Sequence, residues 1–180
     1  ILAIGAPGYG DFVPNTPVQS EVGIAFVFQF SNRSSNRWEA LGQELHGIST
    51  VDRFGSGIAL AGNGDVVAIG ATGSNDNGED SGSVRVFRYN NSTSTWNLVG
   101  GGSITGHVVQ GHAGDTIAVS QDGSRVVIGV TPSIESDITG FAEIFEMGIF
   151  LIGGTFDLSV GGHGWRRWSL ERIDVNSQER

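Results

Sequence analysis

A unit of about 58 to 59 residues recurs along the chain, and this periodicity limits the possible folds more than any other feature of the sequence. The segment AIGA at 3–6 returns at 68–71, after a longer interval because the first loop is longer, and returns as VIGV at 127–130. GIAFVF at 23–28 returns as GSVRVF and GFAEIF, and RWEALG at 37–42 returns as TWNLVG. Because the segments recur in one order, each unit is expected to be one supersecondary structure that stacks on its neighbours.

Each recurring segment has the pattern of a β-strand. In VRVF, Val84 and Val86 fall on one face and Arg85 on the other, whereas VVAIGA is apolar throughout, as expected for a strand buried on both faces. AGNGD at 61–65 and SQDGS at 120–124 contain residues typical of hairpin turns. The second unit therefore predicts four antiparallel strands, at 54–61, 65–71, 82–89 and 95–104.

Four short antiparallel strands that repeat in this way form a blade of a β-propeller. No long segment has the helical period of apolar residues, so the chain is predicted to be all-β. The repeat strands amount to about two and a half to three blades, which is a partial propeller, since closed ones have about four to eight. Additional blades are thus expected from the parent chain or from other copies. A β-sandwich is the alternative fold, although it needs no repeat.

These residues resemble the FG-GAP repeat, the blade unit of integrin-alpha-type β-propellers. Phe54-Gly55 opens the second unit, IGAT at 69–72 stands where that family has Ile-Gly-Ala-Pro, and GSVRVF completes the unit. The first unit contains Gly-Ala-Pro itself at 5–7, whereas the third has Ala113-Gly114 in place of Phe-Gly. The resemblance covers 1–147 and implies an extracellular or cell-surface module of the kind used in cell adhesion, in which no catalytic residue is expected.

The repeat also divides the chain. The units are expected to span 1–53, 54–112 and 113–147, each contributing propeller strands. The remaining segment, 148–180, does not follow the pattern, because the tryptophan due about ten residues after Phe145 comes only at Trp165. We expect this segment to be either a divergent closing strand or a tail whose arginine-rich end docks on an acidic surface.

Composition excludes several classes of function. The net charge of −9 argues against binding to nucleic acid, because a phosphate backbone requires a basic surface. Cysteine is absent, which excludes thiol catalysis and thiolate metal sites. Apolar runs such as that at 149–152 are too short for insertion into a membrane.

In a propeller of this type, the connections at 6–22, 46–53, 72–81, 105–113 and 131–139 would open on one face, here named the loop face. Glu21 and most of the candidates below make it acidic, and Arg53 is its one basic residue. The loop face is therefore predicted to suit a cation or a basic partner, unless it reflects only the acidity of the whole chain. The candidate binding residues are Asp11, Asn75, Asp76, Asn77, Glu79, Asp80, Glu135 and Asp137.

Calcium is the one metal that the sequence brings into question. Integrin-type repeats hold it between the Phe-Gly strand and the Gly-Ala-Pro strand, where this chain has short turns with one acidic residue each, so that site is not expected here. The next connection offers Asn75, Asn77 and Glu79 at alternate positions, but Asp80 replaces the glycine of an EF-type loop. We expect no cofactor, a weak calcium site completed by backbone carbonyls being the alternative.

Two further residue sets have structural or modification roles. Trp38 and Trp96 occupy one position of the repeat, which favours packing between blades over the alternative of sugar stacking. Phe54 and Gly55 are likewise expected to be structural. N-x-S/T sequons, which are glycosylated only in a secretory pathway, occur at Asn32, Asn90 and Asn91.

The leading functional hypothesis is a non-enzymatic β-propeller binding module, extracellular or at the cell surface, that engages a protein or glycan through its loop face. The alternative is a structural accessory subunit, held in a larger assembly through blade edges and the arginine-rich tail. A glycan-active enzyme is the least supported hypothesis, because it needs two facing carboxylates in a cleft and no motif indicates them.

Overall fold

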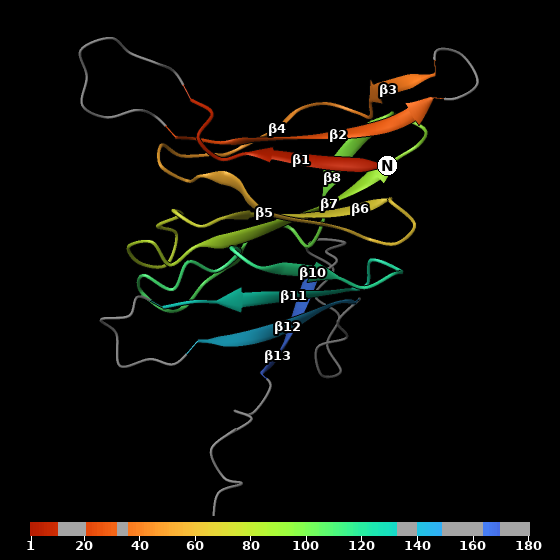
Figure 1. Ribbon diagram of the computed structural model, residues 1–180. Coiled ribbons are helices and arrows are strands. Elements are labelled where there is room, and N and C mark those ends of the chain that lie inside the picture. The colour runs from red at the N-terminus through yellow and green to blue at the C-terminus, as the bar shows by residue number, and fades with distance from the viewer. Residues whose placement is uncertain (11–20, 32–35, 133–139, 149–163, 170–180) are drawn as a thin grey trace, which may run out of the picture.

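The computed structural model of the chain consists of three antiparallel sheets stacked face to face (Figure 1). It describes residues 1–10, 21–31, 36–132, 140–148 and 164–169, and within these ranges it contains strands and no helix. The strands are β1 (Leu2–Ala6), β2 (Ile24–Ser31), β3 (Arg37–Ala40), β4 (Leu45–His46), β5 (Phe54–Leu60), β6 (Val66–Ala71), β7 (Ser83–Asn90), β8 (Thr95–Leu98), β9 (Ile104–Thr105), β10 (Ile117–Val119), β11 (Arg125–Val130), β12 (Phe141–Gly148) and β13 (Gly164–Ser169). The all-β prediction is confirmed.

Each sheet is a meander of consecutive strands. The second sheet has the order β5-β6-β7-β8, with the short β9 paired to β7, and the third has the order β10-β11-β12-β13. The first sheet has the order β1-β2-β3, with β4 paired to β2. The strands expected at 54–61, 65–71 and 82–89 are therefore present, because local turn chemistry and apolar alternation determine their ends and their order. The strand expected at 95–104 is divided into β8 and β9, which both pair with β7.

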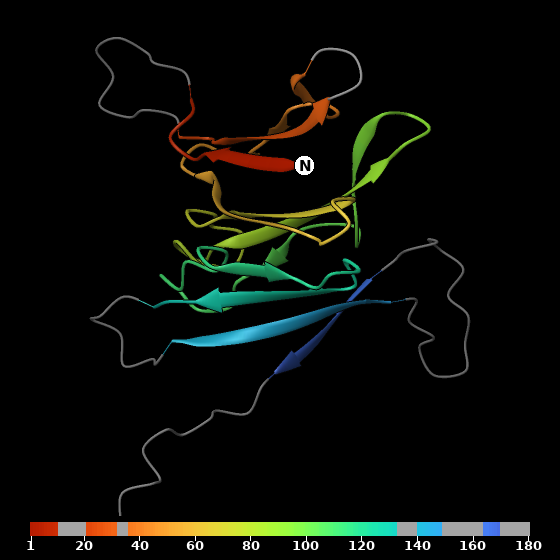
Figure 2. The same cartoon turned by 45° about the vertical axis from the view of Figure 1, so that its right-hand side comes forward.

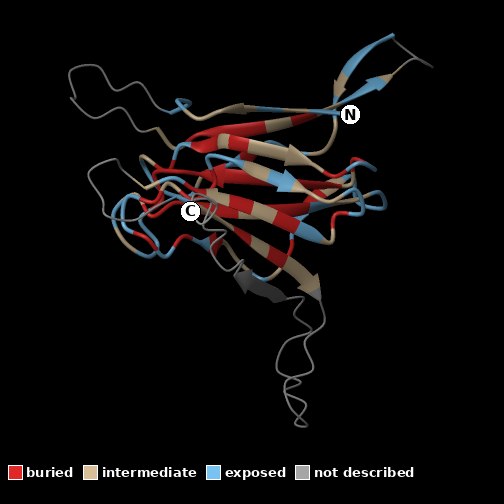
Figure 3. Ribbon diagram, turned by 60° about the horizontal axis from the view of Figure 1, so that its bottom comes forward, coloured by how far each residue is buried: buried red, intermediate tan, exposed pale blue. Residues whose placement is uncertain are grey.

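The second sheet is the centre of the stack and is buried on both faces (Figure 3). Every residue of β6 is buried, which confirms the prediction from its continuous apolar run. One face, including Val67, Ile69 and Phe87, packs toward the first sheet, and the other, including Val84 and Val86, packs toward the third. Three stacked layers are expected of successive propeller blades rather than of a two-layered sandwich.

Glycine pairs explain why the repeat contains Phe-Gly and Gly-Ala at fixed positions. A Cβ atom added to Gly5 of β1 would overlap the carbonyl oxygen of Gly55 in the second sheet. One repeat later, a Cβ atom on Gly70 would overlap the carbonyl oxygen of Gly114. The two motifs thus form the contact by which the backbone of one sheet approaches that of the next.

The third sheet has its tryptophan at the position of the repeat, although a longer connection precedes it. Trp38 pairs with Phe30 in the first sheet and Trp96 pairs with Tyr89 in the second. In the third sheet Trp165 of β13 pairs with Met147 of β12. Residues 164–169 form β13 beside β12 in the third sheet (Figure 2), while 149–163 and 170–180 lie outside the described residues.

The side of the first sheet that faces away from the stack is apolar. We name it the outer face. Trp96 is 2% exposed between two sheets, whereas the equivalent Trp38 is 49% exposed beside Phe30, at 44%. Along β1, Leu2 and Ile4 are similarly exposed. On the neighbouring strand β2, Phe28 and Phe26 lie opposite these two residues, and their rings stack on each other. The outer face consists of Leu2, Ile4, Phe26, Phe28, Phe30 and Trp38.

Candidate functional site: the loop face

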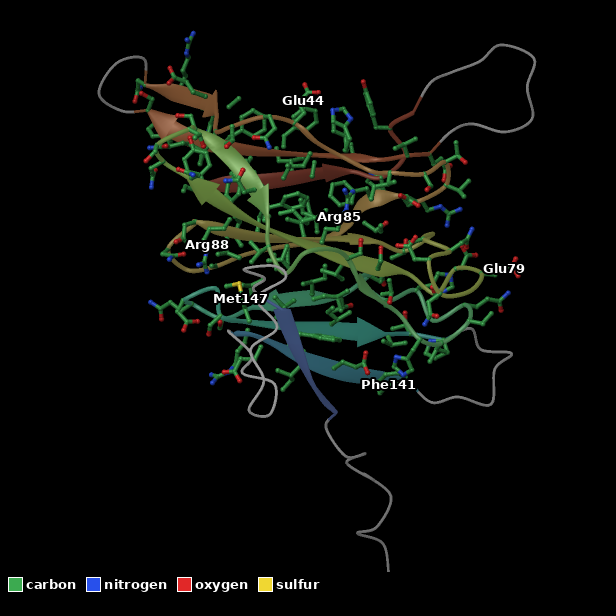
Figure 4. All side chains as sticks on the ribbon, turned by 180° about the vertical axis from the view of Figure 1, so that it is seen from behind. Glu44, Glu79, Arg85, Arg88, Phe141 and Met147 are labelled. Atoms are coloured by element: carbon green, nitrogen blue, oxygen red, sulfur yellow. The ribbon has the colours of Figure 1, made fainter. Side chains whose placement is uncertain are left out.

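Backbone hydrogen bonds join the connections of neighbouring sheets at one end of the stack. The N–H of Gly73, after β6, donates to the carbonyl of Asp52, which precedes β5, at 3.1 Å. The N–H groups of Gln110 and His112 donate to the carbonyls of Glu79 and Asp80, at 2.7 and 3.0 Å. Figure 4 shows Glu79 at this end of the molecule, opposite Arg88 and Met147. The described parts of the loop face are thus one continuous surface.

The connection at 73–81 is organised by its own polar groups. The Asn75 side-chain oxygen accepts a hydrogen bond from the N–H of Asp80 at 2.7 Å, which closes the loop. The Asn77 side-chain amide donates to the carbonyl of Gly106 at 3.0 Å and ties the loop to the segment after β9. Behind them the buried Ser81 hydroxyl donates to the carbonyl of Ser74 at 3.3 Å. Local hydrogen bonds of this kind are what Asn and Ser contribute to turns.

These contacts bear on the predicted calcium ligands. The Asn75 side-chain oxygen already accepts a backbone hydrogen bond. The Asn77 side chain is held in place by the hydrogen bond that its amide nitrogen donates. Within the described ranges, no group of three or more His, Asp or Glu side chains is arranged to hold a metal ion. Calcium takes six to eight oxygen ligands, so a site in this loop would also need backbone carbonyls.

Removing calcium with EDTA is expected to leave the thermal midpoint of unfolding unchanged to within about 1 °C, as measured by circular dichroism. A site with a dissociation constant of about 10 μM would add about 2.7 kcal/mol of stability in about 1 mM calcium, which would shift the midpoint by several degrees. Magnesium chloride at equal ionic strength is the control. A calcium-specific increase that disappears in Asn75→Ala would show that the loop does bind the ion.

The hairpin turn where integrin-type repeats hold calcium also closes on itself. Asp122, between β10 and β11, accepts hydrogen bonds from the Ser120 hydroxyl at 2.6 Å and from the Ser124 N–H at 3.1 Å. These bonds favour the ionised carboxylate and lower the pKa of Asp122 from 3.8 to about 2. In the equivalent turn Asn63 accepts from the Asp65 N–H at 3.2 Å. Both turns use the side chain as a turn cap.

The carboxyl group of Asp122 is expected to titrate with a pKa of about 2 when it is followed by carbon-detected NMR. Because this pKa is lowered on folding, the stabilisation by the carboxylate is complete above its ordinary pKa of 3.8 and is lost as the pH falls through about 2. Ser120→Ala removes the largest cause of the shift and should raise the pKa toward 3.8. A pKa near 3.8 in the unsubstituted protein would contradict the turn geometry.

The charges of the loop face are only partly compensated. Arg53, the basic residue expected there, forms an ion pair with Glu21 at 2.9 Å. Asp76 and Glu79 are exposed, and Asp80 is half-buried. The described residues thus keep a negative loop face after this ion pair is counted. Asp11, Glu135 and Asp137 lie outside the described residues.

Two charged residues near the loop face were missed from the sequence. Asp52 is 7% exposed, and its carboxylate accepts the N–H groups of Ile48 and Ser49 at 2.9 and 2.8 Å. The Arg85 guanidinium lies 4.0 Å from the ring centroid of Phe54 and donates to the carbonyl of His46. Burial lowers the pKa of Arg85, while Asp52 and Asp76 act in the opposite direction.

A signal for both residues exists in the repeat. Arg85 stands where the other units have Phe26 and Glu143, and Asp52 stands where the next unit has Gly111. A charged residue that breaks an apolar or glycine position of a repeat needs a partner when it is buried. The acceptor of Arg85, the His46 carbonyl, comes from another sheet and cannot be inferred from the spacing, whereas the donors to Asp52 come from its own connection.

Strained backbone is concentrated in the connections that enter β5 and β10. Val51 and Arg53 have φ values of 65° and 54°, and at the same places one repeat later Gln110 and His112 have 54° and 47°. Non-glycine residues adopt this region infrequently and at a cost in free energy, which the surrounding hydrogen bonds offset. Such strain is common at binding sites.

Comparison with known proteins supports the assignment of the repeat. A family described as the FG-GAP repeat matches residues 47–87, which contain β5, β6 and part of β7. No curated protein matches the chain. The first and third sheets extend the same arrangement beyond the matched residues. The contacts between sheets recur one repeat apart, both as the bridges Gly23–Phe54 and Gly82–Ala113 and as the two glycine contacts. The chain is therefore a repeat protein of the FG-GAP type.

Proposed function

We propose that the chain is a non-enzymatic β-propeller binding module that engages a protein or glycan through its loop face, outside the cell or at its surface. FG-GAP repeats are typically non-catalytic binding modules and are typical of extracellular proteins. No helix in the described ranges is both long and apolar enough to cross a membrane. The observation that carries the proposal is a loop face whose backbone is fixed between sheets while Asp76 and Glu79 stay exposed.

The charge of this surface favours a basic partner. Exposed carboxylates on a hydrogen-bonded loop lose little conformational entropy when they bind, since the loop is already ordered. Electrostatic complementarity raises the rate of association and selects against acidic surfaces. Among proteins and glycans, we therefore expect a partner that presents Arg or Lys side chains to Asp76 and Glu79.

An array of extracellular protein domains and glycans, probed with the labelled chain, tests the proposal. The double variant Asp76→Asn, Glu79→Gln should lose most of the specific signal and its dependence on salt. The variant Glu39→Gln, Glu44→Gln is the matched control, because it removes the same charge from exposed positions around β3 and β4. Equal signals from both variants would show that the loop face does not bind the partner.

The alternative function, a structural accessory subunit, is favoured by the apolar outer face of the first sheet. Monomeric proteins seldom expose a contiguous apolar surface of this kind without an interaction to cover it. The arginine-rich tail of the same hypothesis lies mostly outside the described residues. Oxidative footprinting of Trp38 in the assembled protein separates the two functions: protection at Trp38 with an unprotected loop face supports the structural role.

Glycosylation at a single asparagine is expected if the chain passes through a secretory pathway. The Asn90 side-chain oxygen accepts the N–H of Ser92 at 2.9 Å, and Asn90 is half-buried at the end of β7. Asn91 is exposed in the turn that follows. Mass spectrometry of chain secreted from eukaryotic cells should find a glycan on Asn91, lost in Asn91→Gln and kept in Asn90→Gln. The reverse pattern would contradict this prediction. Asn32 lies outside the described residues.

A further inference from the structure

The side chain of Asn63, in the turn between β5 and β6, folds back along its own backbone. Its oxygen accepts a hydrogen bond from the N–H of Asp65 at 3.2 Å. To reach that N–H, the side chain must extend over the peptide bond that joins Asn63 to Gly64. The carbon of the side-chain amide is therefore held near the backbone nitrogen of Gly64, and such proximity favours a reaction between the two groups.

This nitrogen is a nucleophile toward the amide once it has lost its proton to a base in the solvent. It forms a bond to the amide carbon, and the side-chain nitrogen leaves as ammonia, which closes a succinimide ring. Water then opens the ring at one of its two carbonyls and yields either aspartate or isoaspartate. Overall, water is consumed and ammonia is released. Glycine favours ring closure, because it has no Cβ atom to obstruct the approach and adopts unusual backbone angles readily.

The chain has a second Asn-Gly pair, Asn77-Gly78, in which the side chain is oriented differently. The Asn77 amide nitrogen donates to the carbonyl of Gly106 at 3.0 Å, so this side chain is tied to a distant segment instead of its own backbone. In both pairs the glycine N–H donates to the carbonyl three residues earlier, at 2.9 Å for Gly64 and 3.3 Å for Gly78, and this bond has to open in either case. The orientation of the side chain is what separates the two pairs.

Two residues with the orientation of Asn63 lack its chemistry. Asp122 accepts the backbone N–H two residues ahead at 3.1 Å and also precedes a glycine, but its carboxylate is ionised and resists attack by a nucleophile. Asn90 accepts the N–H two residues ahead at 2.9 Å, but it precedes Asn91, whose side chain hinders ring closure. Asn63 thus combines a folded-back orientation, a neutral amide and a following glycine, whereas each of the comparison residues lacks one of these conditions.

We propose that Asn63 is a site of spontaneous modification, where the folded chain converts asparagine into aspartate and isoaspartate without an enzyme. Asn63 is exposed, which gives water and a solvent base access to the turn. The hydrogen bond from the Asp65 N–H assists the attack, because it stabilises the negative charge that develops on the amide oxygen. The turn lies at the opposite end of β6 from the loop face, so the proposal does not depend on the proposed function.

The two products are expected to affect the fold differently. Aspartate at position 63 would reproduce the turn of the third sheet, in which Asp122 caps the backbone. Isoaspartate would route the backbone through the former side chain and lengthen it by one carbon. The turn packs closely against its equivalent, since a Cβ atom added to Gly62 would lie 2.7 Å from the side chain of Gln121. A longer turn has little space there, so isoaspartate should loosen the contact between the second and third sheets.

Incubation of the complete chain in mildly alkaline buffer, followed by peptide mapping with mass spectrometry, tests the proposal. In the folded protein, conversion should be at least about tenfold faster at Asn63 than at Asn77. In concentrated urea the two rates should agree within about twofold, because unfolding removes both side-chain orientations while each asparagine still precedes glycine. Methylation by a protein isoaspartate methyltransferase distinguishes isoaspartate from aspartate.

Variants test the chemistry of the turn. Asp122→Asn supplies the missing amide in the equivalent turn, and residue 122 should then convert at a rate within about threefold of that at Asn63. Asn63→Gln should abolish conversion in its turn, because the longer side chain would have to close a larger ring. Asn77→Gln is the matched control and should leave conversion at Asn63 unchanged. Circular dichroism verifies the fold of each variant.

The thermal midpoint of unfolding separates the two products. The fraction that carries isoaspartate, isolated by ion-exchange chromatography, should unfold at least about 2 °C below Asn63→Asp, which itself should match the unsubstituted protein within about 1 °C. An isoaspartate fraction as stable as Asn63→Asp would contradict the expected effect on the contact between the sheets.

Equal rates at the two Asn-Gly pairs of the folded protein would overturn the proposal, as would faster conversion at Asn77. A difference that persists in urea would also overturn it, since the cause would then be the local sequence rather than the fold. A folded Asp122→Asn variant that stays unmodified at residue 122 would show that orientation, amide and glycine together are not sufficient.

Discussion

Replacing Trp96 with alanine is expected to lower the free energy of unfolding by about 3–5 kcal/mol, as measured by urea denaturation. The side chain is 2% exposed, packs on the Tyr89 ring at 5.1 Å and belongs to the core between the first and second sheets. Its indole N–H donates to the carbonyl of Leu41 at 2.7 Å. The alanine variant would leave a cavity and also an unpaired carbonyl between two sheets.

Trp38→Ala is the matched control, because the two tryptophans occupy one position of the repeat. Trp38 is 49% exposed, and its described ring contact is with Phe30, at 5.4 Å. The Trp38→Ala substitution should lower the free energy of unfolding by less than about 1 kcal/mol, as is usual for exposed side chains. Equal losses at the two positions would contradict this account, since they would require the outer face to be covered in solution.

This pair of residues shows which parts of the fold can be predicted from the sequence. Strand positions, their order and their antiparallel pairing depend on local patterns, and the repeat supplies those patterns more than once. The expected strand at 65–71 is β6, at Val66–Ala71, and the expected strand at 82–89 is β7, at Ser83–Asn90. The repeat cannot predict burial, because Trp38 and Trp96 have the same local sequence position and different neighbours.

Charged residues at repeat positions show the same limit. The position held by Phe26 in the first unit is Arg85 in the second and Glu143 in the third. Arg85 is placed over the Phe54 ring, whereas Glu143 is 3% exposed and lies 3.6 Å from the His107 ring nitrogen. The sequence identifies these residues as exceptions to the repeat. Arg85 also donates to the carbonyl of His46 in the first sheet, and His107 follows β9 of the second sheet, so these partners require the stacking of the sheets to be known.

The loop at 73–81 illustrates how one spacing of residues can fit two kinds of chemistry. Asn75, Asn77 and Glu79 alternate as calcium ligands do, yet alternate polar residues also suit a turn that caps its own backbone. The hydrogen bonds of Asn75 and Asn77 are of the second kind. The loop is also held by hydrogen bonds to the segment at 106–112, and nothing within the loop sequence specifies them.

Replacing Gly70 with alanine is expected to destabilise the protein by about 3 kcal/mol or more, the upper end of the range for overpacked sites. The added Cβ atom would overlap the backbone of Gly114, which cannot move away as a flexible side chain would. Because this contact joins the second and third sheets, the loss should be largest there. Hydrogen exchange should increase in β10 and β11 more than in β2.

Gly102→Ala is the control, since an added Cβ atom there has no heavy atom within 4 Å. It should change the free energy of unfolding by no more than about 0.5 kcal/mol. Gly5→Ala tests the same contact one repeat earlier, because its Cβ atom would overlap the carbonyl oxygen of Gly55, and it should increase exchange in β1 instead. Uniform exchange in both variants would contradict a stack held at these glycine pairs. If the two effects stay confined to their own junctions, the glycines of Phe-Gly and Gly-Ala belong to the motif because they set the distance between successive sheets.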